Sequence, residues 1–257
     1  MKRHLIIIDP QRDFCKPEGA LYVRGADEDM RRLAEYVTRE SFDRIHVTLD
    51  SHQWVHIAHP IFWVGPGSEH PAPFTVIQEK DLLDGAWRAS QDGLREYALE
   101  YVRTLAAKGR YSLTIWPPHC IITTPGHAVH DELALALRAW SEANLRPIDF
   151  WAKGSNVRTE HYSAIQADVP DPSDPATSVN QALIGALEEA DELMFAGEAL
   201  DYCLLNTVRD LVDASPEIAG RIVLLKDASS SISGCTIDDH EFFQSLLAKG
   251  ARLAKAS

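Results

Sequence analysis

The chain has 257 residues, of which 45% are hydrophobic and 25% are charged, so it can bury a core for one large α/β domain or two small ones. Its 25 basic and 38 acidic side chains give a formal net charge of -13, which argues against nucleic acid or an anionic membrane as a partner. No apolar run approaches the roughly 18 residues of a membrane-spanning helix.

The amino-terminal segment is basic and then apolar, but its apolar part ends at Asp9 and is too short for a signal peptide. We therefore expect a first strand there. The cysteines are scattered and make no disulfide framework. They are Cys15, Cys120, Cys203 and Cys235. Without an export signal, reduced thiols in a cytoplasm are expected.

Short β-rich runs alternate with amphipathic helical patterns along the chain. Strands are expected at residues 5–8, 44–49, 112–115, 147–151, 192–196 and 221–226. Helices are expected at residues 27–39, 93–107, 128–143, 179–189, 204–214 and 239–249. This alternation predicts an α/β fold in which six parallel strands form a sheet with helices on both faces.

The least regular part of the chain lies between the second and third expected strands. It contains a loop rich in proline and glycine at residues 65–73, followed by one helix. A second long loop, residues 166–177, contains three prolines. Loops of this length tend to be functional covers or partner surfaces. We interpret residues 1–257 as a single domain with an insert at about 60–111.

Cys203 is the most informative residue of the sequence. An apolar run stops at Gly197, and a short turn then leads into the helical pattern that begins at Cys203. Unpaired N–H groups and the helix dipole favour an anion at a helix start, where they lower the pKa of a thiol and can bind an oxyanion. A thiolate nucleophile would be useful at this point.

Other reactive side chains also follow strand ends, where the chemistry of a parallel sheet gathers. Asp9 ends the first expected strand, and Lys153 follows the fourth. A carboxylate near Cys203 could take the thiol proton, and a lysine could hold both groups electrostatically. The alternatives are a turn residue that binds backbone for Asp9 and a solvated charge for Lys153.

A possible metal site begins at Asp50 and His52, which face the same side of an extended segment. With a further histidine they offer ligands suited to Zn²⁺, Fe²⁺ or Mn²⁺. The candidates for that histidine are His56, His59 and His119. Histidines in such a pattern also cap turns or line a core without any metal.

Five blocks of the sequence resemble motifs of the nicotinamidases and the wider isochorismatase-like cysteine hydrolases. They are Asp9-Pro10-Gln11-Arg12-Asp13-Phe14-Cys15, Asp50-Ser51-His52 with His56, Trp116-Pro117-Pro118-His119-Cys120, Phe150-Trp151-Ala152-Lys153-Gly154 and Gly197-Glu198-Ala199-Leu200-Asp201-Tyr202-Cys203. They occur in the family's order over nearly the whole chain, which makes the match specific.

The resemblance implies a three-layer α/β/α fold with a Rossmann-type strand order, and a catalytic triad of Asp9, Lys153 and Cys203. Cys203 would attack an amide carbonyl, Asp9 would shuttle the proton, and Lys153 would stabilise the charged pair. A cis peptide bond before Ala199 would aim the N–H groups of Ala199 and Cys203 at the oxyanion.

The resemblance also implies a divalent metal, Zn, Fe or Mn, held by Asp50, His52 and His119 with His56 as the fourth group. Phe14 and Trp116 occupy positions at which family members hold the substrate's pyridine ring between aromatic side chains.

Three features depart from the family pattern. Arg12 replaces an asparagine, Glu198 replaces an apolar residue and would bring a second carboxylate near the thiol, and the segment between His56 and His119 is unusually long. This insert would reshape the pocket or form a subunit interface of a homo-oligomer.

These features leave three hypotheses for the function. The first is a nicotinamidase, which acts on a small-molecule amide. The second is a related cysteine hydrolase of another small amide, ureido or carbamoyl compound. The third is a non-catalytic binding member.

Overall fold

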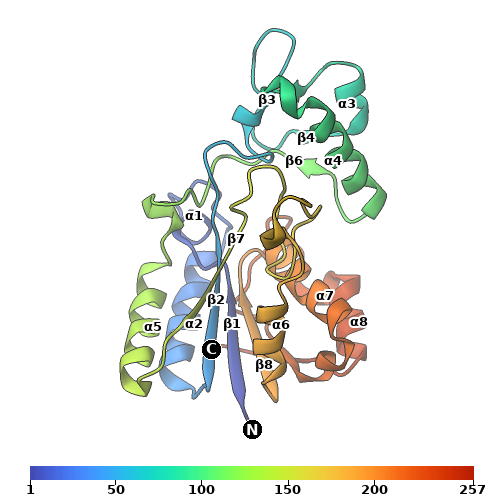
Figure 1. Ribbon diagram of the computed structural model, residues 1–257. Coiled ribbons are helices and arrows are strands. Elements are labelled where there is room, and N and C mark those ends of the chain that lie inside the picture. Colours follow the sequence, from blue (N-terminus) through green and yellow to red (C-terminus); the bar gives the residue numbers. More distant parts are fainter.

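The computed structural model describes residues 1–257 and has a parallel β-sheet between two layers of helices (Figure 1). The strands of this sheet are β1 (Arg3–Ile8), β2 (Arg44–Asp50), β7 (Asp149–Lys153), β8 (Glu192–Gly197), β9 (Ile222–Leu225) and β10 (Arg252–Ala254). The α-helices are α1 (Arg12–Cys15), α2 (Ala26–Arg39), α3 (Glu79–Leu83), α4 (Arg95–Lys108), α5 (Asp131–Asn144), α6 (Gln181–Glu188), α7 (Leu205–Ala214) and α8 (Glu241–Ala248).

The six strands lie in the order β10-β9-β8-β1-β2-β7, and all neighbouring pairs are parallel. Numbered along the chain within this sheet, that is the Rossmann-type order 3-2-1-4-5-6 read from the β7 edge. The predicted fold class and strand order are therefore confirmed. The order reverses between β1 and β8, which is the position where ligands bind in such sheets.

The central strands are apolar because both faces of the sheet are covered. Every residue of β8 is buried, as are the last five of β1. In Figure 1, α2 and α5 cover one face and α6, α7 and α8 cover the other. The helix α2 buries Met30, Leu33 and Val37, which lie on one face at helical spacing.

One predicted strand does not join the main sheet. Residues 112–115 contribute only β6 (Leu113–Thr114), which pairs antiparallel with β4 (Val76–Ile77) in a separate ribbon. The sixth strand of the main sheet is instead β10, at the carboxyl terminus. Local β-propensity does not determine which strand a short run pairs with, and β10 has only three residues, too few for a periodic signal.

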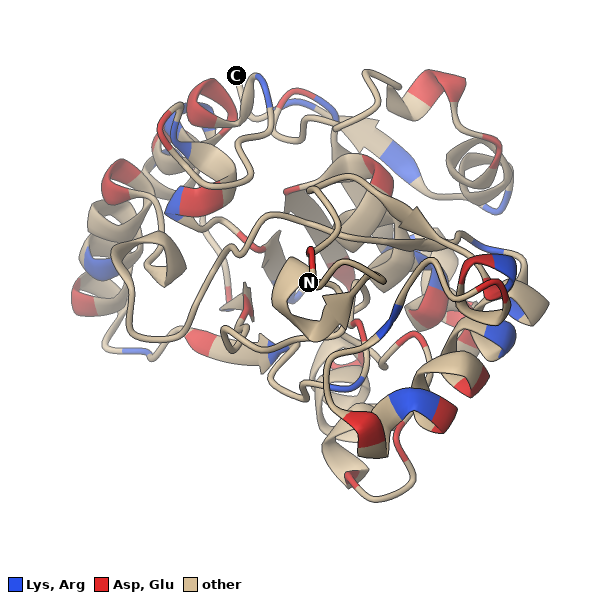
Figure 2. Ribbon diagram, turned by 90° about the horizontal axis from the view of Figure 1, so that it is seen from above, with Lys and Arg blue, Asp and Glu red and all other residues tan.

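The insert lies above the carboxyl edge of the sheet (Figure 1). It contains α3, α4 and a second ribbon, formed by β3 (Trp63–Val64) and β5 (Arg88–Ala89). Viewed from above, residues of both charge signs alternate along the outer helices and loops (Figure 2). None of the helices combines the length and the apolar character that crossing a membrane requires.

Candidate active site

The functional side chains predicted from the sequence meet at the carboxyl edge of four neighbouring strands. Asp9 follows β1, Asp50 ends β2, Lys153 ends β7, and Cys203 lies just after β8. Because β8 and β1 adjoin at the switch point, Cys203 and Asp9 approach each other there. All four side chains are buried.

Lys153 lies at the centre of this group. Its Nζ is 2.8 Å from Asp9 Oδ2, 3.1 Å from Asp50 Oδ1 and 3.6 Å from Cys203 Sγ. It also donates a hydrogen bond to the carbonyl oxygen of His161, at 3.0 Å. Asp9 Oδ1 accepts a hydrogen bond of 2.6 Å from the Thr48 hydroxyl. The ammonium ion is therefore fixed between two carboxylates and the thiol.

The protonation of the group follows from burial and from these contacts. Burial opposes the charge on Lys153, but the carboxylates of Asp50 and Asp9 raise its pKa well above the usual range. Burial also raises the pKa of Asp9, and the charge of Lys153 acts against this shift. The pKa of Cys203 is raised well above its usual range, first by burial, while Lys153 acts in the opposite direction. Cys203 is thus a neutral thiol beside a proton acceptor, whereas a helix start alone would favour a thiolate.

The turn that carries Cys203 is built around Gly197 and Ala199. Gly197 has a φ of 108°, and a Cβ atom there would lie 2.1 Å from the carbonyl oxygen of Ile8, so only glycine fits against β1. The Glu198–Ala199 peptide bond is cis, as the resemblance implied. The Ala199 N–H finds no acceptor within the protein.

Cys203 lies in a single π-helical turn, Leu200–Leu204, ahead of α7. The carbonyl oxygen of Ala199 accepts from the N–H groups of Tyr202 and Leu204 and passes over Cys203.

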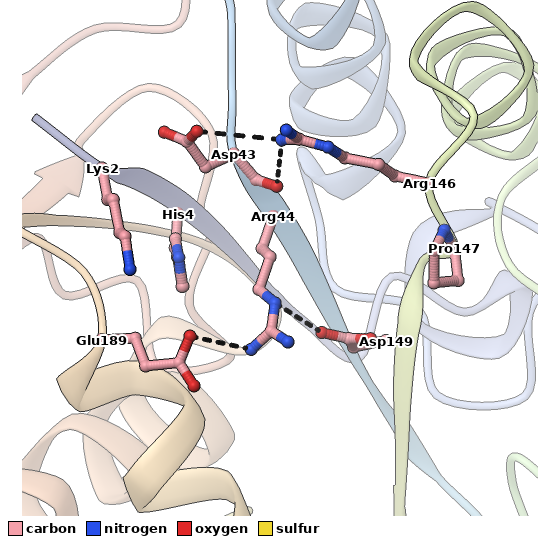
Figure 3. A pocket seen from close by; sticks show the side chains of 8 residues that line it. All are labelled: Lys2, His4, Asp43, Arg44, Arg146, Pro147, Asp149 and Glu189. Carbon is pink, nitrogen blue, oxygen red and sulfur yellow. Dashed lines mark hydrogen bonds and ion pairs between the residues drawn. The ribbon is translucent and has the colours of Figure 1, made fainter.

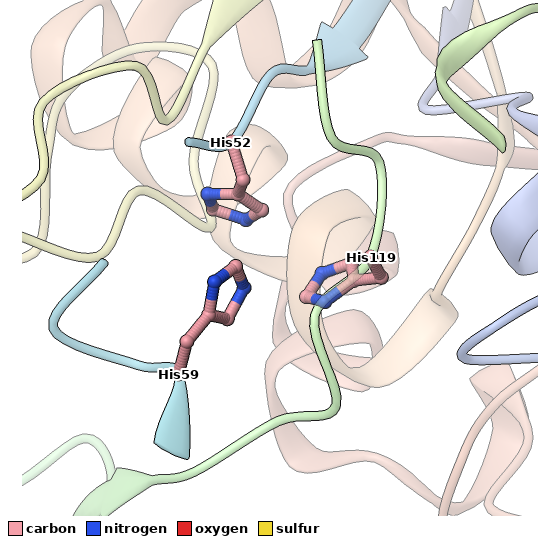
Figure 4. Close-up of side chains that lie close together, drawn as sticks. All are labelled: His52, His59 and His119. Carbon is pink, nitrogen blue, oxygen red and sulfur yellow. The ribbon is translucent and has the colours of Figure 1, made fainter. Parts of the chain in front are cut away.

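Three buried histidines, His52, His59 and His119, lie close together (Figure 4). Asp50 Oδ2 lies 2.9 Å from His52 Nε2 and 3.3 Å from His119 Nε2. His59 completes the cluster, since the ligand atoms of the three histidines all lie within 4.8 Å of one another. One carboxylate and three imidazoles form a donor set suited to Zn²⁺, Fe²⁺ or Mn²⁺.

Outer hydrogen bonds orient the three rings. The Nδ1 of His52 lies 3.2 Å from the carbonyl oxygen of Gly154, and that of His119 lies 2.8 Å from the carbonyl oxygen of Pro117. His59 Nδ1 faces the carbonyl oxygen of Trp54 at 3.4 Å. An Nδ1–H that donates to a carbonyl leaves a lone pair on Nε2. His52 and His59 have no hydrogen-bond partner at Nε2. The residues therefore fit a bound metal ion.

His56, which the sequence analysis expected as the fourth metal group, is placed differently. Its Nδ1 accepts from the Ala58 N–H at 3.2 Å, and its Nε2 lies 3.1 Å from the carbonyl oxygen of Thr159. Both ring nitrogens are thus used by backbone. The ligand atoms of His59 group with those of His52 and His119, whereas the ligand atoms of His56 group with those of His52 and Glu160. Sequence spacing alone could not distinguish these two arrangements. Burial and the neighbouring His52 and His119 lower the pKa of His59 to about 2, so it stays neutral as a ligand must.

The two predicted aromatic residues, Phe14 and Trp116, pack against different neighbours. Phe14 packs edge-on against His119, with ring centroids 5.2 Å apart. Trp116 packs against Tyr202, with ring centroids 5.2 Å apart, and its Nε1–H donates to Tyr162 Oη at 2.9 Å. The sequence analysis did not single out Tyr162 or Tyr202, although Tyr202 directly precedes the candidate nucleophile.

The two substitutions within the motifs point away from the thiol. Arg12 forms an ion pair with Asp131 at the start of α5. Glu198 binds the Ser230 N–H at 3.0 Å, and the charged groups that affect Cys203 are Lys153, Asp9 and Asp50. The Glu198 carboxylate thus binds the loop at Ser230 and makes no hydrogen bond to Cys203.

A separate cavity of about 370 Å³ opens at the amino ends of β1 and β2, far from this chemistry (Figure 3). Its charges pair among themselves: Arg44 with Asp149 and Glu189, and Arg146 with Asp43. This cavity contains none of the candidate catalytic residues.

The strand order and the residues at its switch point define a class of protein. The chain has the isochorismatase-like α/β fold, with aspartate, lysine and cysteine at the carboxyl edge of the sheet. This fold is the one that the resemblance implied.

Comparison with known proteins points to one group within that class. The chain is 26% identical to the nicotinamidase of Escherichia coli (strain K12) over 255 residues, which cover 98% of this chain and 93% of that protein. It is 24% identical to the nicotinamidase of Saccharomyces cerevisiae over 231 residues, 89% of this chain and 88% of that protein. No protein-family model matches the chain.

Solved structures share the fold at lower identity. The nicotinamidase and pyrazinamidase of Acinetobacter baumanii superposes with a TM-score of 0.65 at 21% identity, covering 99% of this chain and 96% of that one. The pyrazinamidase of Pyrococcus horikoshii in complex with zinc superposes with a TM-score of 0.57 at 19% identity, covering 99% of both chains.

Proposed function

We propose that this protein is a metal-binding cysteine amidohydrolase that converts nicotinamide and water to nicotinate and ammonia. The observation that carries the proposal is the assembly of Cys203, Asp9 and Lys153 beside the Asp50–histidine cluster. The nicotinamidases of Escherichia coli and Saccharomyces cerevisiae, which resemble the chain over most of its length, support the choice of substrate.

Cys203 Sγ attacks the amide carbonyl carbon as Asp9 takes the thiol proton. The tetrahedral intermediate collapses, its C–N bond breaks, and Asp9 gives the proton to the leaving nitrogen, which departs as ammonia. The acyl group is then a thioester of Cys203. Asp9 next takes a proton from water, whose oxygen attacks the thioester, and returns that proton to the thiol as nicotinate leaves.

Two features of the site stabilise charge during these steps. The ammonium ion of Lys153 holds Asp9 and lies 3.6 Å from Cys203 Sγ, so it favours the transient thiolate. The free N–H of Ala199, together with that of Cys203, supplies donors for the oxyanion. Because the site is buried, these interactions act at low dielectric and are stronger than in water.

Asp50, His52 and His119 would hold the metal ion, with His59 as the further ligand. When bound, the ion supplies a Lewis acid to which the ring nitrogen of the substrate can coordinate, and so it orients the amide toward Cys203. Zinc is one candidate, since the related pyrazinamidase of Pyrococcus horikoshii binds it. Phe14 and Trp116 are proposed to contact the flat faces of the substrate ring.

One observation favours a second candidate, a cysteine hydrolase of another small amide, ureido or carbamoyl compound. Phe74 of the insert packs edge-on against Trp116, with ring centroids 5.8 Å apart, so the insert contributes to the surroundings of the pocket. A pocket with a different rim would accept a substrate with a different acyl group.

Ammonia release from nicotinamide tests the proposal against both alternatives. Purified protein supplied in turn with Zn²⁺, Fe²⁺ and Mn²⁺ is expected to release ammonia from nicotinamide, and Cys203→Ala is expected to abolish the release while the fold persists. A panel of small amides, ureas and carbamoyl compounds run in parallel identifies the second candidate. No thiol-dependent turnover of any of them would favour a non-catalytic binding protein.

The proposed product, nicotinate, points to a role in NAD salvage. The four cysteines are all free, which fits the expected cytoplasmic compartment.

A further inference from the structure

The proposed mechanism leaves one buried acid of the nucleophile turn unused. Glu198 is fully buried on the turn between β8 and Cys203. Its Oε2 accepts a hydrogen bond of 3.0 Å from the Ser230 N–H, but its Oε1 has no partner. A buried carboxylate oxygen without a donor is costly, so the surroundings of Oε1 determine the state of this side chain.

The neighbour of Glu198 is a second buried acid, Asp29 of α2. The carboxylate of Asp29 already accepts from the Ser230 hydroxyl and from Arg32. Two adjacent buried carboxyl groups cannot both ionise cheaply. Burial and the charge of Asp29 raise the pKa of Glu198 well above its usual range. A neutral Glu198 has a proton on Oε1 that can be donated to Asp29, which satisfies both oxygens.

The segment that Glu198 binds also holds the residues on both sides of Ala199. The Gly197 N–H donates to the carbonyl oxygen of Ala228 at 2.9 Å, and the Leu200 N–H donates to that of Ser230 at 2.8 Å. The bond from Ser230 to Glu198 adds a third tie. Ala199 itself makes no such bond with its N–H, which therefore depends on its neighbours for its direction.

We propose that Glu198 is a positioning residue, which fixes the free Ala199 N–H for the oxyanion by tying the nucleophile turn to Ser230 and to Asp29 of α2. This inference rests on the proposed role of Ala199 in amide hydrolysis. Glu198 acts through Ala199 and does not touch the substrate. It joins three parts of the chain at one point: the turn after β8, the loop after β9 and the first turn of α2.

The test separates oxyanion stabilisation from thiol reactivity. Acylation of Cys203 by p-nitrophenyl acetate passes through an oxyanion, so its rate depends on the oxyanion donors. Alkylation of Cys203 by iodoacetamide forms no oxyanion. Glu198→Leu has a side chain of similar size without polar atoms, and we expect it to slow acylation about tenfold or more. This effect is smaller than the roughly 100- to 1,000-fold loss of rate on deleting an oxyanion donor, because Glu198 acts only through Ala199. The alkylation rate of this variant and its KM for a turned-over amide are expected to stay near those of the wild type.

Conservative variants supply the rescue. Glu198→Gln can accept from Ser230 and donate to Asp29, so it is expected to recover most of the acylation rate. Glu198→Asp keeps the carboxyl group but shortens its reach, so an intermediate rate is expected even if the leucine variant fails to fold. Glu192→Leu is the matched control, because Glu192 lies at the opposite end of β8 and pairs with Arg3 and Arg252. It is expected to lower stability without changing acylation per folded molecule.

Unchanged acylation in Glu198→Leu and Glu198→Asp would overturn the inference, and so would an equal loss of acylation and alkylation. A Glu198→Gln variant as slow as Glu198→Leu would also overturn it. Because acylation by p-nitrophenyl acetate depends on the thiol and the oxyanion donors but not on recognition of nicotinamide, a wild-type protein that is acylated but leaves nicotinamide intact would contradict the proposed substrate and leave this inference standing.

Discussion

The three candidate catalytic residues are far apart in the sequence: Asp9, Lys153 and Cys203. Each could nevertheless be predicted as a site residue from the residues that precede it in the chain. Each follows an apolar run that ends at the carboxyl edge of the sheet, and the parallel arrangement then brings them together. The state of the thiol could not be predicted in this way. A helix start suggested a low pKa, whereas burial, which depends on the whole fold, raises the pKa of Cys203.

Asp9→Asn tests the proton acceptor. Without the carboxylate, the thiol loses its base, so alkylation of Cys203 by iodoacetamide at neutral pH is expected to slow by about 100-fold or more. Because burial raises the pKa of Cys203, the rate in this variant should keep rising with pH beyond the roughly 8.5 of an ordinary thiol. Peptide mapping by mass spectrometry follows Cys203 separately from the more exposed Cys235, which serves as the internal control.

A second prediction at the residue scale concerns the choice between two histidines. Loss of a residue that only hydrogen-bonds to a metal ligand typically weakens metal binding roughly 10- to 100-fold. Because His59 is proposed to bind the metal directly, His59→Ala is expected to weaken metal binding by more than this. His56→Ala removes two bonds to backbone and should lower stability while retaining the metal. Metal content after dialysis, measured by mass spectrometry, distinguishes them; loss of metal only in His56→Ala would contradict the assignment.

The nucleophile turn shows what one element requires from its sequence. Gly197 must be glycine because β1 approaches it closely, and the Ala199 N–H ahead of the helical turn has no acceptor within the protein. The resemblance to known motifs implied this arrangement, including the cis bond at Ala199. Local periodicity alone could give only the end of β8 and the start of the following helix.

Gly197→Ala is expected to destabilise the protein and abolish activity. The added Cβ would meet the carbonyl oxygen of Ile8 at 2.1 Å in a backbone conformation that alanine rarely adopts, which costs on the order of 1–3 kcal/mol or more. Gly185→Ala in α6 is the control: nothing lies within 4 Å of its added Cβ, so helix propensity should stabilise it by about 0.5–1 kcal/mol. Urea unfolding measures both; a stable, active Gly197→Ala would refute the close-approach argument.

At the scale of the whole molecule, alternating strands and helices were enough to predict a parallel sheet covered on both faces. The positions of β1, β2, β8 and β9 could be predicted because long apolar runs mark buried strands. The short β10 could not, since pairing at a sheet edge is decided by tertiary contacts. Which histidine lies with His52 and His119 likewise depended on the path of the chain.

The insert gives rise to a prediction about assembly. We propose that the protein forms a homo-oligomer through this region, because several large apolar side chains of residues 60–111 are exposed. They are Ile61, Phe74, Val76 and Leu83. Leu83→Glu is expected to shift the molecular mass in light scattering toward the monomer, whereas Leu135→Glu on α5, which is similarly exposed, should not. A wild-type monomer, or dissociation only by Leu135→Glu, would contradict this proposal.

The account as a whole depends on a thioester at Cys203, and hydroxylamine tests for it most directly. During turnover of nicotinamide, hydroxylamine should compete with water for the thioester. As the concentration of hydroxylamine rises, nicotinohydroxamate should therefore replace nicotinate as the product. Cys203→Ala should form neither product. Release of ammonia without any hydroxamate, or by the Cys203→Ala variant, would contradict the account.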